Sequence, residues 1–156
     1  MGTDLRYLVQ SGYPSESVIG CEVRREFIDL GYELYGDRDT CPIPFLVGDI
    51  FDVSPRPFPQ QAGDVCPSLN NAQCLNELRG RVKYVYAGAL FHLFDEGTQE
   101  AIARRLATIL DVTEGGSPAV LFGRSVAQSE EGVIDDAMGR YVEPHVIFGV
   151  VPFNNS

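Results

Sequence analysis

The chain has 156 residues, of which 44% are hydrophobic and 10% aromatic, and its formal net charge is −10. This length and composition are typical of one globular domain with its own core. The negative charge would repel nucleic acid and anionic membranes, and no apolar run is long enough to span a membrane. No charged leader followed by an apolar run indicates a signal peptide, so we expect a cytoplasmic protein.

The metal-binding side chains are few and poorly spaced. The chain has four cysteines and two histidines, and no two cysteines are separated by two residues. A closed zinc site needs four such ligands in close pairs. The sequence therefore predicts no metal, and cysteines that are reduced thiols.

The spacing of apolar residues predicts helices that alternate with short strands. In chain order we expect a helix over 3–10, a strand over 17–21, a helix over 24–35, a strand over 44–48, a helical turn over 75–79, a strand over 82–87, a helix over 98–110 and strands over 119–123 and 145–151. This alternation favours the α/β class, with a Rossmann-like, mostly parallel sheet flanked by helices.

Some finer details of this pattern can also be tested. Thr3 is expected to cap the first helix. The core-facing stripes of the two longer helices are expected to be Phe27, Leu30, Gly31 and Leu34, and Ile102, Leu106, Ile109 and Leu110. We predict one domain over 1–156, with an irregular loop insertion over 54–73 that borders a ligand pocket and a divergent tail over 125–156.

Ligands of open parallel sheets bind beyond the carboxyl ends of the strands, so the residues at those ends are the candidate site. Glu22 follows the strand over 17–21, and a carboxylate there can accept hydrogen bonds from both hydroxyls of a ribose. Asp49 can accept from an exocyclic amine, while Ile50 and Phe51 pack on a planar base. The plainer alternatives are a solvated charge for Glu22 and a turn aspartate with core neighbours for Asp49.

A second group of candidates follows the strand over 82–87. Ala87 and Gly88 are small enough to leave room for a ligand, and His92 can act as a general base or hold a substrate oxygen. A lone histidine among apolar residues is also a common structural residue. Arg124 can pair with an anionic substrate or with a surface carboxylate. The chain has neither a Gly-x-Ser-x-Gly nucleophile motif nor a Walker loop.

Taken as a series, these segments resemble the class I S-adenosylmethionine-dependent methyltransferases of fungal secondary metabolism, above all those of meroterpenoid pathways. The resemblance extends from residue 2 to about residue 128 and is carried by residues 2–6, 18–34, 42–45, 48–51, 86–94 and 120–124. It implies S-adenosylmethionine as cofactor, without a metal, and methyl transfer to an oxygen of a small hydrophobic metabolite, a polyketide–terpenoid acid or phenol.

The resemblance also assigns roles to individual residues. Glu22 would be the ribose ligand and Asp49 the acid at the adenine edge, with Ile50 beside the base. Gly2 would end the glycine-rich loop at the methionine part of the cofactor. Ala87 and Gly88 would complete the cofactor site, and His92 would serve a phenol acceptor as base.

The chain departs from the family pattern at both ends. The family's first strand should precede Gly2, and a further helix and a strand pair should follow residue 128. We therefore expect an incomplete sheet and weak or absent cofactor binding. The absent strand would lie between the strands over 17–21 and 82–87. Either these two strands pair directly, or another chain, as in a homodimer, supplies the missing edge.

Two other functions remain open on the sequence. The chain could be a cofactor-free cyclase, isomerase or intermediate-binding protein derived from the methyltransferase fold. It could also be a non-catalytic partner of a full-length paralogue. Equilibrium binding of S-adenosylmethionine separates the methyltransferase from both alternatives.

Overall fold

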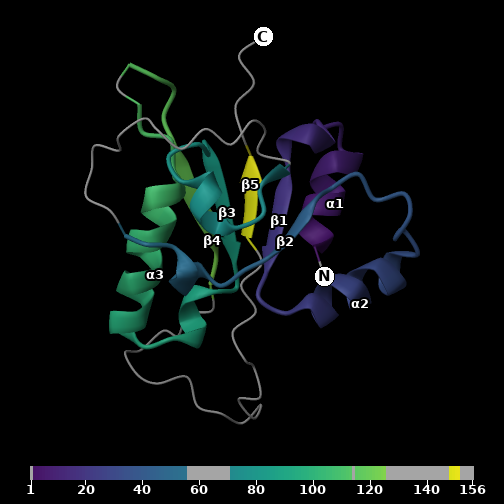
Figure 1. The fold of residues 1–156 in the computed structure, drawn as a ribbon, viewed down its shortest axis with the longest axis horizontal. Helices are drawn as coiled ribbons and strands as arrows, with labels where there is room; N and C mark the ends of the chain where they lie inside the picture. The colour runs from purple at the N-terminus through teal and green to yellow at the C-terminus, as the bar shows by residue number, and fades with distance from the viewer. Residues whose placement is uncertain (1, 56–70, 114, 126–147, 152–156) are drawn as a thin grey trace.

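The computed structural model describes residues 2–55, 71–113, 115–125 and 148–151. These residues form a five-stranded sheet with helices on its two faces, in the strand order β2-β1-β5-β3-β4. In Figure 1, α3 covers one face, and α1 and α2 lie on the other side of the sheet. The α/β class is confirmed, and this arrangement is compatible with a Rossmann-like methyltransferase fold.

The strands, the α-helices and the turn η4 agree with the expected elements to within a few residues, whereas the short turns η1, η2 and η5 were not predicted. The strands are β1 (Ile19–Glu22), β2 (Phe45–Val47), β3 (Tyr84–Gly88), β4 (Val120–Arg124) and β5 (Phe148–Val151); the α-helices are α1 (Thr3–Gln10), α2 (Arg25–Tyr35) and α3 (Glu96–Ile109); and the 3-10 turns are η1 (Ser15–Ser17), η2 (Ile50–Asp52), η4 (Leu75–Leu78) and η5 (Phe91–Leu93). Most of the predicted insertion over 54–73 and of the predicted tail over 125–156 lies outside the described residues.

The centre of the sheet differs from both arrangements that we expected. β1 and β3 do not pair with each other, because β5 lies between them and runs antiparallel to both. Gly149 is opposite Gly20 on one side and Tyr86 on the other. The physical reason is that buried backbone N–H and C=O groups must be paired, and a valine-rich segment of the same chain forms a strand readily. A strand of this chain therefore supplies the pairing.

The main core lies between the sheet and α3. Val85 and Ala87 of β3 point into it, and the apolar stripe of α3 meets them from the other side. Ile102, Leu106 and Ile109 are fully buried, as predicted from their spacing. α3 begins two residues earlier than expected, because Asp95 caps it by accepting a hydrogen bond from the backbone N–H of Thr98 at 3.0 Å.

The opposite face carries α1 and α2, and here two predictions are wrong. The N-cap of α1 is Gly2, with φ 70°, and not Thr3, whose hydroxyl lies 2.7 Å from the Tyr35 hydroxyl instead. Within α2, Leu30 and Leu34 are 45% and 64% exposed, while the buried residues are Ile28 and Gly31. α2 packs against β1, and its Tyr32 ring meets the Phe45 ring of β2 edge-on with 5.9 Å between the ring centres, so the covered strip of the helix differs from the predicted one.

Arg6 connects α1 to the loop after α2. Its guanidinium donates to both carboxylate oxygens of Asp37, at 2.6 and 2.9 Å, and lies 4.7 Å from the centre of the Tyr35 ring. The hydrogen bond from Arg6 lowers the pKa of Asp37. Paired bonds of this kind are directional, so they fix α1 against the end of α2.

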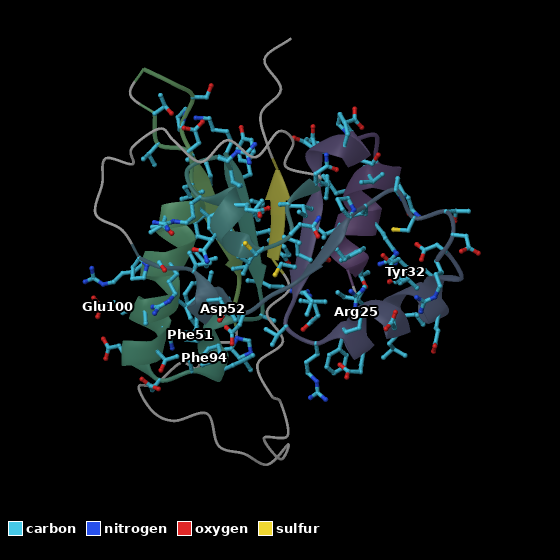
Figure 2. All side chains as sticks on the ribbon, viewed as in Figure 1. Arg25, Tyr32, Phe51, Asp52, Phe94 and Glu100 are labelled. Atoms are coloured by element: carbon cyan, nitrogen blue, oxygen red, sulfur yellow. The ribbon has the colours of Figure 1, made fainter. Side chains whose placement is uncertain are left out.

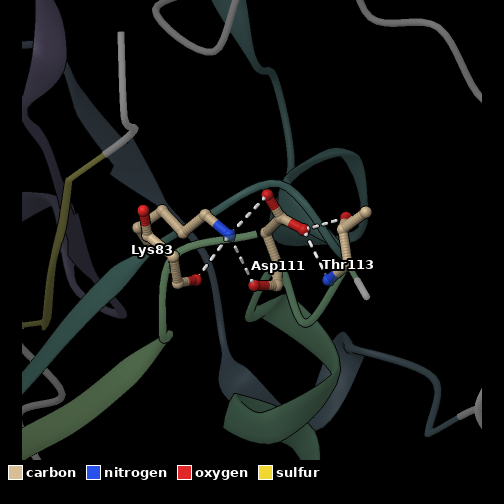
Figure 3. A network of polar contacts seen from close by, with 4 residues as sticks. Lys83, Asp111 and Thr113 are labelled. Atoms are coloured by element: carbon tan, nitrogen blue, oxygen red, sulfur yellow. Dashed lines mark hydrogen bonds and ion pairs between the residues drawn. The ribbon is translucent and has the colours of Figure 1, made fainter. Parts of the chain in front are cut away.

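A buried lysine connects the start of β3 to the turn after α3 (Figure 3). The ammonium group of Lys83 donates to the backbone oxygens of Asp111 and Ser117 at 3.1 and 3.0 Å, and forms an ion pair with Asp111 Oδ2 at 3.1 Å. Asp111 Oδ1 accepts from the backbone N–H of Thr113 at 3.0 Å. Burial acts to raise the pKa of Asp111, but the hydrogen bonds from Thr113 and Lys83 outweigh it and lower that pKa.

We expect Asp111→Asn to lower the free energy of unfolding at pH 7 by about 2–3 kcal/mol, because it leaves the buried Lys83 charge without its partner. A carboxyl whose pKa is lowered by folding stabilises the native state above its unfolded pKa and loses that effect as pH falls through the folded pKa. Urea denaturation should therefore show the difference between wild type and Asp111→Asn shrinking once the pH falls below the ordinary aspartate pKa of about 3.9.

The control for this experiment is Arg104→Ala, which breaks the exposed Arg104–Glu100 pair on α3. We expect it to cost at most about 0.5 kcal/mol. A difference between wild type and Asp111→Asn that stays constant from pH 7 down to about pH 2.5, well below the ordinary aspartate pKa of about 3.9, would contradict the assigned role of the Asp111 carboxylate.

Candidate functional site

The carboxyl ends of β1 to β4 meet at one edge of the sheet, and the amino end of β5 reaches the same edge. The ends of β1 and β2 are held together by a backbone bond from Gly48 N to Glu22 O at 3.1 Å. The Cys21 thiol adds a bond to Gly48 O at 3.4 Å, and burial raises the pKa of this thiol, so it stays protonated and can donate. These bonds fix the ends of β1 and β2 relative to each other at the edge where the sequence predicts the ligand.

Glu22 is the last residue of β1 and is only 1% exposed. Its Oε1 accepts a hydrogen bond from the backbone N–H of Arg24 at 3.2 Å. Its Oε2 is buried and has no hydrogen-bond partner among the described residues. An unsatisfied buried oxygen is costly, and a ligand hydroxyl is a donor that would satisfy it.

Asp49 lies next to Glu22 along this edge and is half-buried. Its Oδ1 accepts from the backbone N–H of Phe51 at 2.9 Å and so caps η2. Ile50 is fully buried in the core, whereas Phe51 is 42% exposed, with the Arg105 guanidinium 5.1 Å from its ring centre. Figure 2 labels Phe51 and Asp52 on η2. The apolar surface beside Asp49 thus comes from Phe51 more than from Ile50.

Gly2 lies at the start of α1, on the β1–β2 side of the site. A side chain at this position would place its Cβ 2.7 Å from the Phe45 ring, and the φ of 70° is itself unfavourable for other residues. In the first turn of α1, Asp4 accepts a hydrogen bond from the Tyr86 hydroxyl of β3 at 3.1 Å. The start of α1 therefore reaches across β5 toward β3.

Ala87 and Gly88 end β3. Ala87 is 2% exposed, so its methyl group belongs to the core, while Gly88 is half-buried. A Cβ at Gly88 would lie 2.6 Å from the Tyr86 hydroxyl. The next residue, Ala89, has φ 55°, and it is the one non-glycine residue with positive φ in the described part of the chain. This strained backbone turns the chain from β3 into η5.

His92 lies on η5, just beyond the carboxyl end of β3. Its Nδ1 is 3.2 Å from the hydroxyl oxygen of Ser125, which directly follows β4. Arg124 is 74% exposed and forms an ion pair with Asp4 at 4.0 Å. Sequence reasoning gave no individual role in the site to Ser125, Asp4, Tyr86 or Ala89, because only the packing of β3, β4 and α1 brings them to this edge.

The candidate residues form two groups. Glu22 and Asp49 lie on the β1–β2 side, and Gly88 and His92 lie on the β3–β4 side. β5 separates the groups, so they are two strand spacings apart, or about 10 Å. A family first strand between β1 and β3 would give the same spacing, whereas direct pairing of β1 with β3 would halve it.

Across residues 2–55, 71–113, 115–125 and 148–151, no group of three or more histidine, cysteine or acidic side chains is placed to hold a metal ion. In the same residues, no helix has the length and apolar character needed to cross a membrane.

Neither a family model nor a solved structure matches the chain. It is 30% identical to O-methyltransferase phiE of a fungal species, over 85% of this chain and 37% of the relative. It is 29% identical to methyltransferase adrK of Penicillium rubens, over 70% of this chain and 33% of the relative. It is 25% identical to the asnovolin E/chermesin D methyltransferase nvfJ of Aspergillus novofumigatus, over 88% of this chain and 42% of the relative.

The chain thus spans between 33% and 42% of the length of these three relatives. The matches cover between 70% and 88% of the chain itself. By sequence, most of this chain is therefore similar to part of the methyltransferases of fungal secondary metabolism.

Proposed function

We propose that the chain binds S-adenosylmethionine and takes part in methyl transfer to an oxygen of a small hydrophobic metabolite, an acid or a phenol. Support for methyl transfer comes from the three relatives, each of which is named a methyltransferase, and one of which, phiE, is named an O-methyltransferase. Support for the place of binding comes from the carboxyl edge of the sheet, where ligands of this fold class bind.

The observation that carries the proposal is the buried Oε2 of Glu22, which lacks a hydrogen-bond partner among the described residues. A ribose presents two neighbouring hydroxyl groups, and a carboxylate can accept from both. The backbone bond from Arg24 to Oε1 fixes the carboxylate, so it is held in place before a ligand arrives. The residues at this end of β1 therefore fit the ribose of the cofactor.

The rest of the β1–β2 side fits the adenine. Asp49 uses Oδ1 to cap η2, which leaves Oδ2 to accept from an exocyclic amine. Phe51 is the exposed aromatic residue beside it and offers an apolar face to a planar base. Both side chains come from the turn that follows β2, so one short segment would recognise the base.

When bound, S-adenosylmethionine supplies a methyl group that is already activated as a sulfonium. The work left to the protein is to hold the acceptor oxygen in line and to exclude water. For a phenol, His92 would accept the hydroxyl proton at its Nε2. A carboxylate acceptor is already deprotonated near neutral pH and would need no base.

The proposal is tested by titration calorimetry with S-adenosylmethionine up to millimolar concentration, followed by mass spectrometry of candidate acids and phenols. We expect weak, saturable binding and a mass increase of one methyl group on the acceptor. Binding of hydrophobic intermediates without binding of the cofactor would contradict the proposal and favour an intermediate-binding protein.

Glu22→Gln should separate binding from stability. Replacing a buried, partly unpaired carboxylate by a neutral amide should leave the free energy of unfolding unchanged or raise it by about 1 kcal/mol. Cofactor binding should weaken about tenfold or more, because one strong acceptor for the ribose is lost. Thermal unfolding and calorimetry measure the two effects. A variant that is destabilised by several kcal/mol would instead indicate a structural role for Glu22.

Glu22→Ala and His92→Ala should fail in different ways if methyl transfer to a phenol is observed. Glu22→Ala should mainly raise the KM for the cofactor, because the ribose contact is the same in the ground state and the transition state. His92→Ala should lower kcat about 100-fold and leave cofactor binding nearly unchanged. A folded His92→Ala variant with wild-type kcat would return His92 to a structural role and favour a carboxylic acid as the acceptor.

A further inference from the structure

The strand pairing of β3 with β4 continues one residue beyond both strands. Gly88 is paired with Arg124, and the backbone N–H of Ala89 then donates to Arg124 O at 2.8 Å. The positive φ of Ala89 turns the chain at this point, and η5 begins two residues later. This backbone arrangement brings Ser125, the residue after β4, to the His92 ring.

The Ser125 hydroxyl lies 3.2 Å from Nδ1 of His92 and can act in either direction. If it donates, Nδ1 is the acceptor and Nε2 carries the proton. If it accepts, Nδ1 carries the proton and Nε2 holds the lone pair. Only the second tautomer lets Nε2 act as a base.

The accepting arrangement also suits the state that follows proton transfer. Once Nε2 has taken a proton, both ring nitrogens are donors, and the Ser125 oxygen can still accept from Nδ1 without turning. The charged groups around this edge are Arg124, beside Ser125, and Asp4, which is 4.0 Å from Arg124 and accepts from Tyr86. The Asp4 carboxylate offsets the positive charge of Arg124 next to a ring that becomes cationic.

We propose that Ser125 is a positioning residue, which accepts a hydrogen bond from Nδ1–H of His92 and so keeps Nε2 as the nitrogen that takes the proton of the acceptor. This inference rests on the proposed methyl transfer to a hydroxyl acceptor. The proton moves from the acceptor hydroxyl to Nε2 and is later released from the imidazolium to water, so the ring is restored after each turnover.

The tautomer of His92 can be measured without turnover. The chain has two histidines, so a His145→Gln background leaves the His92 ring as the one imidazole in ¹⁵N NMR spectra of the full chain. In this background we expect the Nδ1–H tautomer to dominate, Ser125→Ala to shift the population toward Nε2–H, and Ser125→Thr, which keeps a hydroxyl, to restore it.

Kinetics with a phenol acceptor give the second measurement. Ser125→Ala should lower kcat about threefold to tenfold, the effect of one neutral hydrogen bond, and should leave the KM for S-adenosylmethionine unchanged. Ser125→Thr should return kcat to near the wild-type value. A lower kcat in both variants to the same extent would contradict a role for the hydroxyl group.

The two proposals fail in distinguishable ways. Equal tautomer populations in wild type and Ser125→Ala, or a wild-type ring that is already in the Nε2–H form, would overturn the role of Ser125 whatever the turnover. A tautomer shift in Ser125→Ala, together with no methyl transfer to any acceptor by the wild type, would support the positioning contact and count against the proposed function.

Discussion

The antiparallel pairing of β5 with both β1 and β3 is the interaction on which the rest of the structure depends. Within the sheet, β1 and β2 on one side and β3 and β4 on the other are connected only through β5 in the described residues. Without it, two inner strand edges would present unpaired backbone groups, and each buried one would cost about 1–3 kcal/mol. Four residues, Phe148–Val151, therefore determine whether the two parts form one sheet.

This pairing also sets the dimensions of the candidate site. With a strand between them, the end of β1 that carries Glu22 and the end of β3 that carries Gly88 are about 10 Å apart. Gly20 of β1 leaves room for the packing of α1 on the sheet, because a Cβ at this position would overlap the Phe45 ring and come close to Leu5 of α1. The hydrogen bond from the Tyr86 hydroxyl to Asp4 connects α1 to β3.

Features that depend on local pattern were predictable from the sequence. The regular apolar spacing of α3 and the short apolar runs of β1 to β4 identified these elements, and the rule for strand ends led to Glu22 and Asp49. The partners of β5 were not predictable, because strand pairing between residues far apart leaves no local signal. The buried face of α2 was predicted only in part, because the position at which the helix packs on the sheet decides which of its residues are covered. Ser125 became a candidate only when the pairing of β3 with β4 was known.

Amide hydrogen exchange of residues 148–151 tests the central role of β5 most directly. We expect slow exchange there, comparable to that of β1 and β3, and Val150→Pro, which removes one backbone donor and distorts the strand, should accelerate exchange in β1 and β3 as well. Exchange of residues 148–151 at the rate of an unprotected chain, with β1 and β3 still protected in Val150→Pro, would contradict the placement of β5 at the centre of the sheet.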